Sequence, residues 1–202
     1  MFAEEYTPRH RGFDEHVGYL QGCLSEATHI ASCCQPGKNS GDKEFVCDAP
    51  KGKDYRGYDW WSSLTADAHG ESVPDPTANH SSSASIIGNT AVDFIKRQQN
   101  AKEPFFLTLP FQNIHEPYTV EEKYRDLYQS YTNLTQDEIT MFGYISEMDF
   151  EVGEVVAALK ATGAYDNTII AFTSDNGAPP AGTTHITHTY IPYDSTCFGM
   201  SC

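Results

Sequence analysis

Basic residues are scarce in this chain of 202 amino acids, which has 13 Lys and Arg against 28 Asp and Glu and a formal net charge of −15. A nucleic acid would be repelled over most of such a surface, so the charge argues against a DNA or RNA partner. Long apolar runs are also missing, and none approaches the roughly 20 residues that a membrane helix needs. Aromatic residues make up 12% of the chain, which argues against intrinsic disorder. The composition therefore indicates a globular protein with no nucleic-acid partner and no membrane span.

The cysteines lack the C-x-x-C pairing that is typical of zinc sites. Four of the six fall within residues 23–47, namely Cys23, Cys33, Cys34 and Cys47. Their clustering in a loop-rich stretch predicts a disulfide-stapled loop, with a zinc site as the less favoured interpretation. The pairing of these disulfide candidates stays open.

Two N-x-S/T sequons, beginning at Asn79 and Asn133, are candidate glycosylation sites. They fit a lysosomal or secreted protein. Met1, however, is not followed by the basic and apolar regions of a signal peptide. An internal piece of a longer exported protein would reconcile the two observations.

From residue 84 onward the pattern is that of an α/β protein. Apolar residues at helical spacing predict a helix over residues 84–99, followed by a short buried strand over 105–109. A short helix is expected over residues 121–128. A capping box at Thr135-Gln136-Asp137-Glu138 opens a long helix that ends near Gly163, and residues 168–173 read as a second buried strand.

The candidate site residues follow these two strands. Asp175 and Asn176 come after the second strand and offer hard oxygen ligands for Ca²⁺ or Mg²⁺, although an ordinary strand-end turn has the same chemistry. His115 comes after the first strand and could donate to an anionic substrate, although a structural loop histidine is the simpler interpretation. Because the carboxyl ends of parallel strands meet at one edge of a sheet, these residues are expected to lie together.

Four motifs occur in an order and spacing that resemble the arylsulfatases, most closely the arylsulfatase B group. They are Arg11-Gly12-Phe13-Asp14 with Gly18-Tyr19, Pro104-Phe105-Phe106-Leu107 leading to His115-Glu116-Pro117, Met148-Asp149 with Val152-Gly153, and Asn167-Thr168 leading to Ser174-Asp175-Asn176-Gly177. The resemblance covers residues 4–22 and 84–177.

The resemblance implies an alkaline-phosphatase-like α/β fold, here a partial, mostly parallel sheet flanked by helices. It implies calcium-dependent hydrolysis of sulfate esters carried by a small molecule or a glycan. Asp175 and Asn176 would be two of the ligands of a single Ca²⁺ ion, and His115 would hydrogen-bond the sulfate. The nucleophile of such enzymes is a formylglycine made from the cysteine of a C-x-P-S-R motif.

No such nucleophile motif is present in this chain, so we expect an internal fragment of the catalytic domain that is inactive alone. Cys34-Gln35-Pro36-Gly37-Lys38 is a decoy, because Gly and Lys replace Ser and Arg. Residues 1–177 are expected to form the partial domain, with residues 23–83 as a Cys-rich insert. Residues 178–202, which lack periodicity, read as a disordered tail outside the family.

Two other functions remain open. One is a non-catalytic sulfatase-like protein that binds a glycan or a partner. The other is a related phosphodiesterase or phosphatase, which Asn176 beside Asp175 disfavours, because a two-zinc site usually has Asp-His there.

Overall fold

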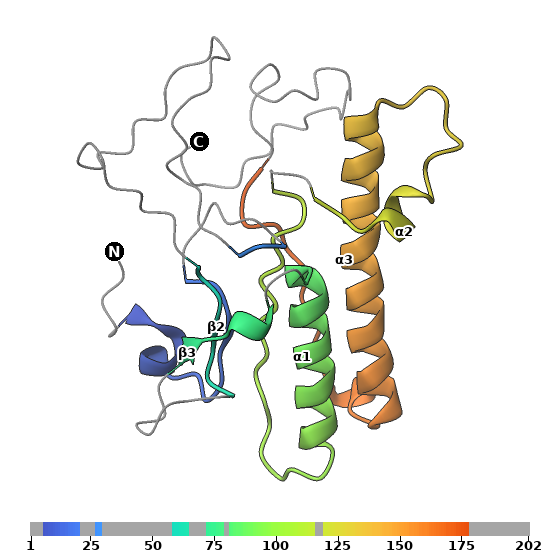
Figure 1. Cartoon of the computed structure of the whole chain (residues 1–202). Coiled ribbons are helices and arrows are strands. Elements are labelled where there is room, and N and C mark those ends of the chain that lie inside the picture. The colour runs from blue at the N-terminus through green and yellow to red at the C-terminus, as the bar shows by residue number, and fades with distance from the viewer. Residues whose placement is uncertain are drawn as a thin grey trace, which may run out of the picture. The chain divides into compact units, whose positions relative to one another are not determined.

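A computed structural model describes residues 6–20, 27–29, 58–64, 72–78, 81–115 and 119–177. The chain divides into two compact units, residues 1–168 and residues 169–202. The elements of the first unit (Figure 1) are the 3₁₀ helices η2 (Pro8–Arg11), η3 (Pro76–Ala78) and η4 (Tyr165–Asn167), the strands β1 (Val17–Gly18), β2 (Trp61–Ser62) and β3 (Val73–Pro74), and the helices α1 (Ser83–Gln98), α2 (Glu122–Arg125) and α3 (Gln136–Ala161).

Helix α1 confirms the predicted helix to within one residue at each end. Ser82 caps its N-terminus, where the side-chain oxygen accepts a hydrogen bond from the Ser85 backbone N–H at 3.4 Å. Lys96 and Arg97 occupy the last turn, where positive charge is favourable to the helix dipole. The shorter predicted helix over residues 121–128 is a single turn, α2.

Helix α3 begins and ends with the signals that its sequence carries. The Thr135 side chain accepts from the Glu138 N–H at 3.2 Å, and Glu138 Oε2 accepts from the Thr135 N–H at 2.7 Å, which completes the predicted capping box. At the other end Gly163 has a φ of +76°. Its N–H bonds to the Lys160 carbonyl at 3.1 Å while that of Ala164 bonds to the Leu159 carbonyl at 3.0 Å. This is a Schellman motif, and it needs the left-handed backbone that glycine adopts readily.

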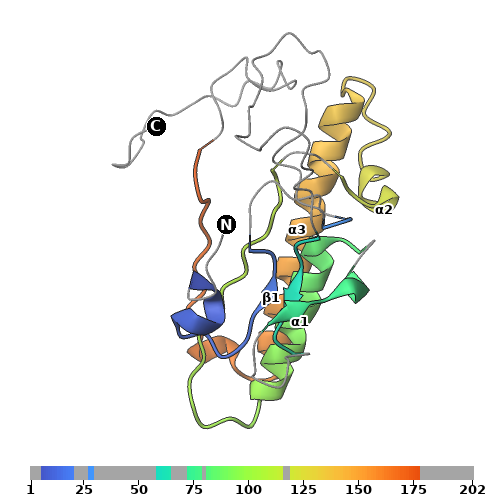
Figure 2. The same cartoon turned by 60° about the vertical axis from the view of Figure 1, so that its left-hand side comes forward.

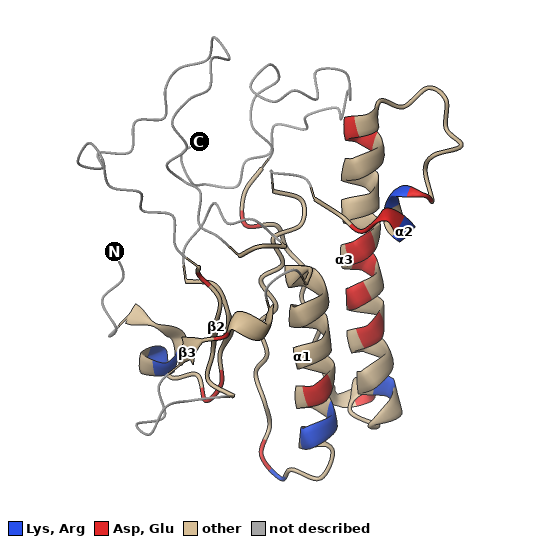
Figure 3. Ribbon diagram, viewed as in Figure 1, with Lys and Arg blue, Asp and Glu red and all other residues tan. Residues whose placement is uncertain are grey.

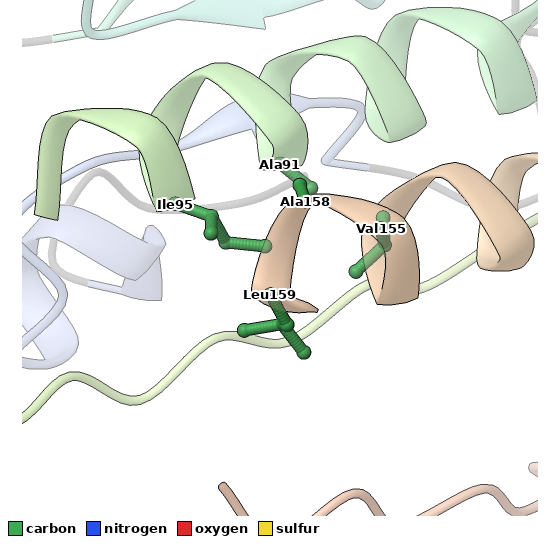
Figure 4. Close-up of a cluster of buried hydrophobic side chains, with 5 residues drawn as sticks. All are labelled: Ala91, Ile95, Val155, Ala158 and Leu159. Atoms are coloured by element: carbon green, nitrogen blue, oxygen red, sulfur yellow. The ribbon is translucent and has the colours of Figure 1, made fainter. Parts of the chain in front are cut away.

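Helices α1 and α3 lie side by side and run in the same direction (Figures 1 and 2). Ser85 in the first turn of α1 contacts Glu151 in the second half of α3, and Ile95 in the last turn of α1 packs with Leu159 in the last turn of α3. The apolar part of the interface (Figure 4) contains Ala91, Ile95, Val155, Ala158 and Leu159. Burying a side chain such as Ile95 or Leu159 contributes about 1.5–3 kcal/mol, so this cluster holds the two helices together.

The segment predicted as the first strand runs as extended chain against the α1–α3 cluster. Phe105, Leu107 and Leu109 are half-buried against the α1–α3 cluster, while Phe106 and Thr108 are exposed. This alternation has the period of two that a strand requires. Within the part of the chain that the structure describes, however, no ladder pairs with it, so the predicted strand is an extended segment without a sheet neighbour.

The second predicted strand, residues 168–173, also differs from its prediction as a buried strand. Ile169 is 97% exposed and Phe172 is 75% exposed. A parallel strand is buried by neighbours on both edges and helices on both faces, and none of the described strands pairs with this segment. The expected parallel sheet is therefore not formed among the described residues.

The sheet that does form is small and antiparallel, in the order β1–β2–β3. It lies beside a second cluster of buried residues, Trp60, Ala78 and Ile87, the last of which comes from α1. Asp59 supports this region by accepting hydrogen bonds from the Trp61 indole N–H at 2.8 Å and from the Leu20 backbone. The N-terminal motif region is thereby joined to helix α1.

Acidic side chains recur along α3 (Figure 3), where they include Glu138, Glu147, Asp149, Glu151 and Glu154. Two of the acidic residues, Glu147 and Glu151, are buried rather than solvated.

Among the helices that the structure describes, none is long and apolar enough to span a bilayer.

Candidate functional site

His115 lies at the end of a tight turn that follows the extended segment. Its backbone N–H donates to the Gln112 carbonyl at 2.8 Å, and its side chain is exposed. The chain entering the turn is held at Pro110, whose carbonyl accepts a hydrogen bond from the Tyr19 hydroxyl at 2.8 Å. His115 is therefore exposed beyond the end of the extended segment.

Asn113 connects this turn to helix α3. Its Nδ2 amide donates to the Tyr144 carbonyl at 2.8 Å and to Glu147 Oε2 at 3.3 Å. An amide NH₂ has two protons, so both of its donors are engaged on α3. The side chains on either side in sequence, Gln112 and Ile114, are respectively half-buried and exposed.

Glu147 and Glu151 lie one helical turn apart on the same face of α3, and they are 0% and 4% exposed. Glu151 Oε1 accepts a hydrogen bond from the Ser85 hydroxyl of α1 at 2.9 Å. Burial raises the pKa of Glu151, while the Ser85 hydrogen bond lowers it and the neighbouring Glu147 raises it further. Burial also raises the pKa of the Tyr124 hydroxyl. The Glu147 and Glu151 carboxylates raise this pKa further.

Sequence reasoning missed this carboxylate pair, because a glutamate on a helix is normally solvated. The buried positions of the helix include the apolar residues Ile139, Val155 and Leu159, but also Glu147 and Glu151. The available signal was on α1, where small residues recur at positions 84, 85, 88 and 91. A Cβ atom on Gly88 would overlap Oε2 of Glu151 and lie 2.9 Å from its Cδ, so glycine leaves the space that this carboxylate occupies.

Asp175 and Asn176 belong to the second unit, where they follow the extended segment in a bend and are exposed. The bend is held locally, since the Ser174 hydroxyl donates to the Asn176 carbonyl at 2.5 Å and Thr173 donates to the Ser174 carbonyl at 3.0 Å. A carboxylate and an amide oxygen are ligand types that suit Ca²⁺. Among the described residues no three His, Cys, Asp or Glu side chains converge on one point.

The two halves of the predicted site thus lie in different compact units, each described by itself. Whether His115 and the pair Asp175 and Asn176 face one another stays a prediction. Asn133 is exposed just before the capping box of α3, as a glycosylation site requires. Asn79 and the disulfide candidates Cys23, Cys33, Cys34 and Cys47 lie outside the described residues, as does the expected tail over residues 178–202.

Comparison with known proteins matches residues 32–196 of the chain to the family model described as Sulfatase. The chain is 27% identical to mouse (Mus musculus) arylsulfatase J over 180 residues, which is 89% of this chain and 25% of that protein. It is 37% identical to the N-acetylgalactosamine-6-sulfatase of Canis lupus familiaris over 89 residues, which is 44% of this chain and 15% of that protein. The chain therefore spans about a quarter or less of these two relatives.

Two crystal structures of Ps i-CgsB resemble the chain. The complex with k-i-k-neocarrahexaose superposes with a TM-score of 0.55 at 24% identity, and the second structure with a TM-score of 0.54 at 25% identity. Each alignment covers 82% of this chain and 33% of the other. The likeness shows the fold, of which this chain is one part.

Proposed function

Since the chain belongs to the sulfatase family and has part of its alkaline-phosphatase-like fold, we propose that it supplies a segment of the catalytic domain of a calcium-dependent sulfuric ester hydrolase. The observation that carries the proposal is the family match over residues 32–196, which includes both His115 and the Asp175-Asn176 pair. The substrate class is a sulfate ester on a small molecule or a glycan. A sulfate carries negative charge, so in a chain of net charge −15 it needs local donors to hold it.

His115 is the donor that this chain offers to the substrate. Its exposed imidazole can donate a hydrogen bond to a sulfate oxygen, which would orient the ester. Asp175 and Asn176 would contribute oxygen ligands to the calcium ion, which supplies Lewis-acid polarisation of the sulfate when it is bound. Roughly six to eight oxygen ligands surround Ca²⁺ in proteins, so these two residues hold only part of its coordination sphere.

The 202 residues contain no C-x-P-S-R nucleophile motif. A sulfatase of this type needs that nucleophile to form its covalent intermediate. We therefore propose that the chain by itself has no appreciable sulfatase activity, and that turnover belongs to the full-length polypeptide that carries these residues.

An aryl sulfate assay tests the activity. The full-length polypeptide and the 202-residue chain are each incubated with 4-nitrocatechol sulfate and CaCl₂. We expect turnover by the first only, and a loss in kcat of about 10²–10³-fold for His115→Ala, the range typical of removing one hydrogen-bond donor to a reacting oxygen. The exposed His10 is the matched control, and His10→Ala should behave as wild type. Turnover by His115→Ala equal to wild type would overturn the role of this residue.

Calcium binding is tested separately with Tb³⁺ as a luminescent probe. Asp175→Ala should weaken Tb³⁺ binding by the full-length polypeptide, whereas Asp166→Ala, which removes an exposed carboxylate of η4, should not. Equal affinities in the two variants would refute the assignment of Asp175 as a ligand.

We also propose a lysosomal or secreted location, which the sequon at the exposed Asn133 supports. The full-length polypeptide, expressed in a mammalian cell line, should migrate faster on a denaturing gel after treatment with PNGase F. The variant Asn133→Gln should lose one glycan. Identical mobility of the variant and the wild type before treatment would count against glycosylation at this position.

A further inference from the structure

We propose that Glu147, acting through Asn113, positions the turn that carries His115 and so orients the imidazole of the proposed sulfate site. This inference rests on the proposed function for its catalytic consequence. The connection itself, from a buried carboxylate on α3 to the turn, is independent of that function.

The tip of the turn has little apolar burial to hold it. Ile114 is 48% exposed and the His115 side chain is exposed as well. The backbone bond from His115 to Gln112 closes the turn but joins it only to itself. Among the hydrogen bonds described for residues 112–115, the two from Asn113 to Tyr144 and Glu147 reach another element. The Asn113 amide therefore joins the tip of the turn directly to helix α3.

The acceptor side of the contact is rigid. Glu147 is 0% exposed and lies one turn before Glu151, which is bonded to Ser85 and occupies the space above Gly88. The α1–α3 interface thus holds this face of α3 in one place. The second acceptor, the Tyr144 carbonyl, is part of the helix backbone itself. A donor that bonds both acceptors is held at a defined point on a rigid helix.

The chemistry requires an amide at position 113 and a side-chain oxygen at position 147. Aspartate in place of Asn113 has the same shape but no donor, and it would place a carboxylate against the Tyr144 carbonyl and the Glu147 carboxylate. Glutamine in place of Glu147 keeps an oxygen that can accept from Asn113. Leucine there fills a similar volume and accepts nothing.

Hydrogen–deuterium exchange on the full-length polypeptide tests the connection without any need for turnover. In Asn113→Asp and Glu147→Leu we expect amides of residues 111–115 to exchange about tenfold faster, and those of α1 and the second half of α3 to keep their wild-type rates. Glu147→Gln and the exposed matched control Asn100→Asp should exchange as wild type. Unchanged exchange of residues 111–115 in Asn113→Asp, or equal acceleration of the turn and both helices, would overturn the proposal.

Kinetics with 4-nitrocatechol sulfate then separates positioning from stability. At a temperature well below the thermal midpoints of both variants, we expect Asn113→Asp to lower kcat/KM about tenfold and Glu147→Gln to keep the wild-type value. Normal kcat/KM in Asn113→Asp despite a mobile turn would refute the orienting role. Absence of turnover in the wild type would instead refute the proposed function, while the exchange result would still decide whether Glu147 holds the turn.

Discussion

Substituting Gly88 by alanine tests the close approach of α1 and α3 quantitatively. The new Cβ would overlap Glu151 Oε2 and lie 2.9 Å from Cδ and 3.0 Å from Cβ of that residue. Rotating the carboxylate relieves the first two contacts but breaks its 2.9 Å hydrogen bond from Ser85, and the Cβ of Glu151 is attached to α3 and cannot rotate away.

The magnitude follows from three contributions. Losing a hydrogen bond to a carboxylate costs about 1.5–3 kcal/mol, and overpacking an interface costs about 1–3 kcal/mol. Replacing glycine by alanine inside a helix returns about 1 kcal/mol. The free energy of unfolding should therefore fall by about 1.5–5 kcal/mol, which is large compared with the total stability of about 5–15 kcal/mol that is typical of proteins.

The assay is urea denaturation followed by circular dichroism at 222 nm. Gly153→Ala is the matched control, because Gly153 is exposed on α3 and an added Cβ meets nothing within 4 Å. This control should gain about 0.5–1 kcal/mol. In a Glu151→Ala background the cost of Gly88→Ala should shrink, since the obstructing side chain is gone. Equal stabilisation by Gly88→Ala and Gly153→Ala would refute the proposed contact.

Two further predictions concern α3. Thr135→Ala removes the N-cap oxygen of the capping box and should lower the free energy of unfolding by about 1 kcal/mol in the same denaturation assay. The exposed Thr132 provides the control variant, Thr132→Ala. Equal effects of the two substitutions would argue against the cap. Glu151→Gln should change the pH dependence of stability. Because burial raises the pKa of Glu151 above 4.5 in the folded state, wild-type stability falls relative to the variant as pH rises from about 4.5 through the raised pKa. Denaturation midpoints at pH 4 and pH 7 measure this difference, and a wild type that gains on the variant over that range would contradict it.

The helices were the most predictable part of the fold, because their signals are local. Ser82, the capping box of Thr135 and Glu138, and Gly163 each act within a few residues of the helix ends that they define. A hydrogen bond between residues three or four positions apart needs no information from the rest of the chain. Prediction from sequence therefore placed α1 and α3 closely.

Strands could be predicted only as extended chain. Phe105, Leu107 and Leu109 have the alternating burial of a strand, but pairing depends on partners elsewhere in the chain. Residues 168–173 are rich in β-branched side chains, yet Ile169 is 97% exposed. β-propensity describes a fit to a half-buried pleated surface, and no strand in the described part of the chain supplies that surface beside this segment.

Candidate site residues could be chosen from the sequence by their chemistry, but the residues that support them could not. His115, Asp175 and Asn176 were identified by residue type and by their position after predicted strands. Asn113 was not, because its significance depends on Glu147, which is 34 positions away in the sequence. A glutamate on a helix is normally solvated, so nothing local marks Glu147 as buried.

By itself the sequence indicated the family, the helix ends and the candidate residues for binding sulfate and calcium, since these depend on residue types at short spacings. Only the tertiary structure decided which face of α3 is buried. Two glutamates lie there because Gly88 and Ser85 on the neighbouring helix provide the space and a donor for one of them, and Asn113 provides a donor for the other. Burial of a charged group depends on its partners, and those partners come from distant parts of the chain.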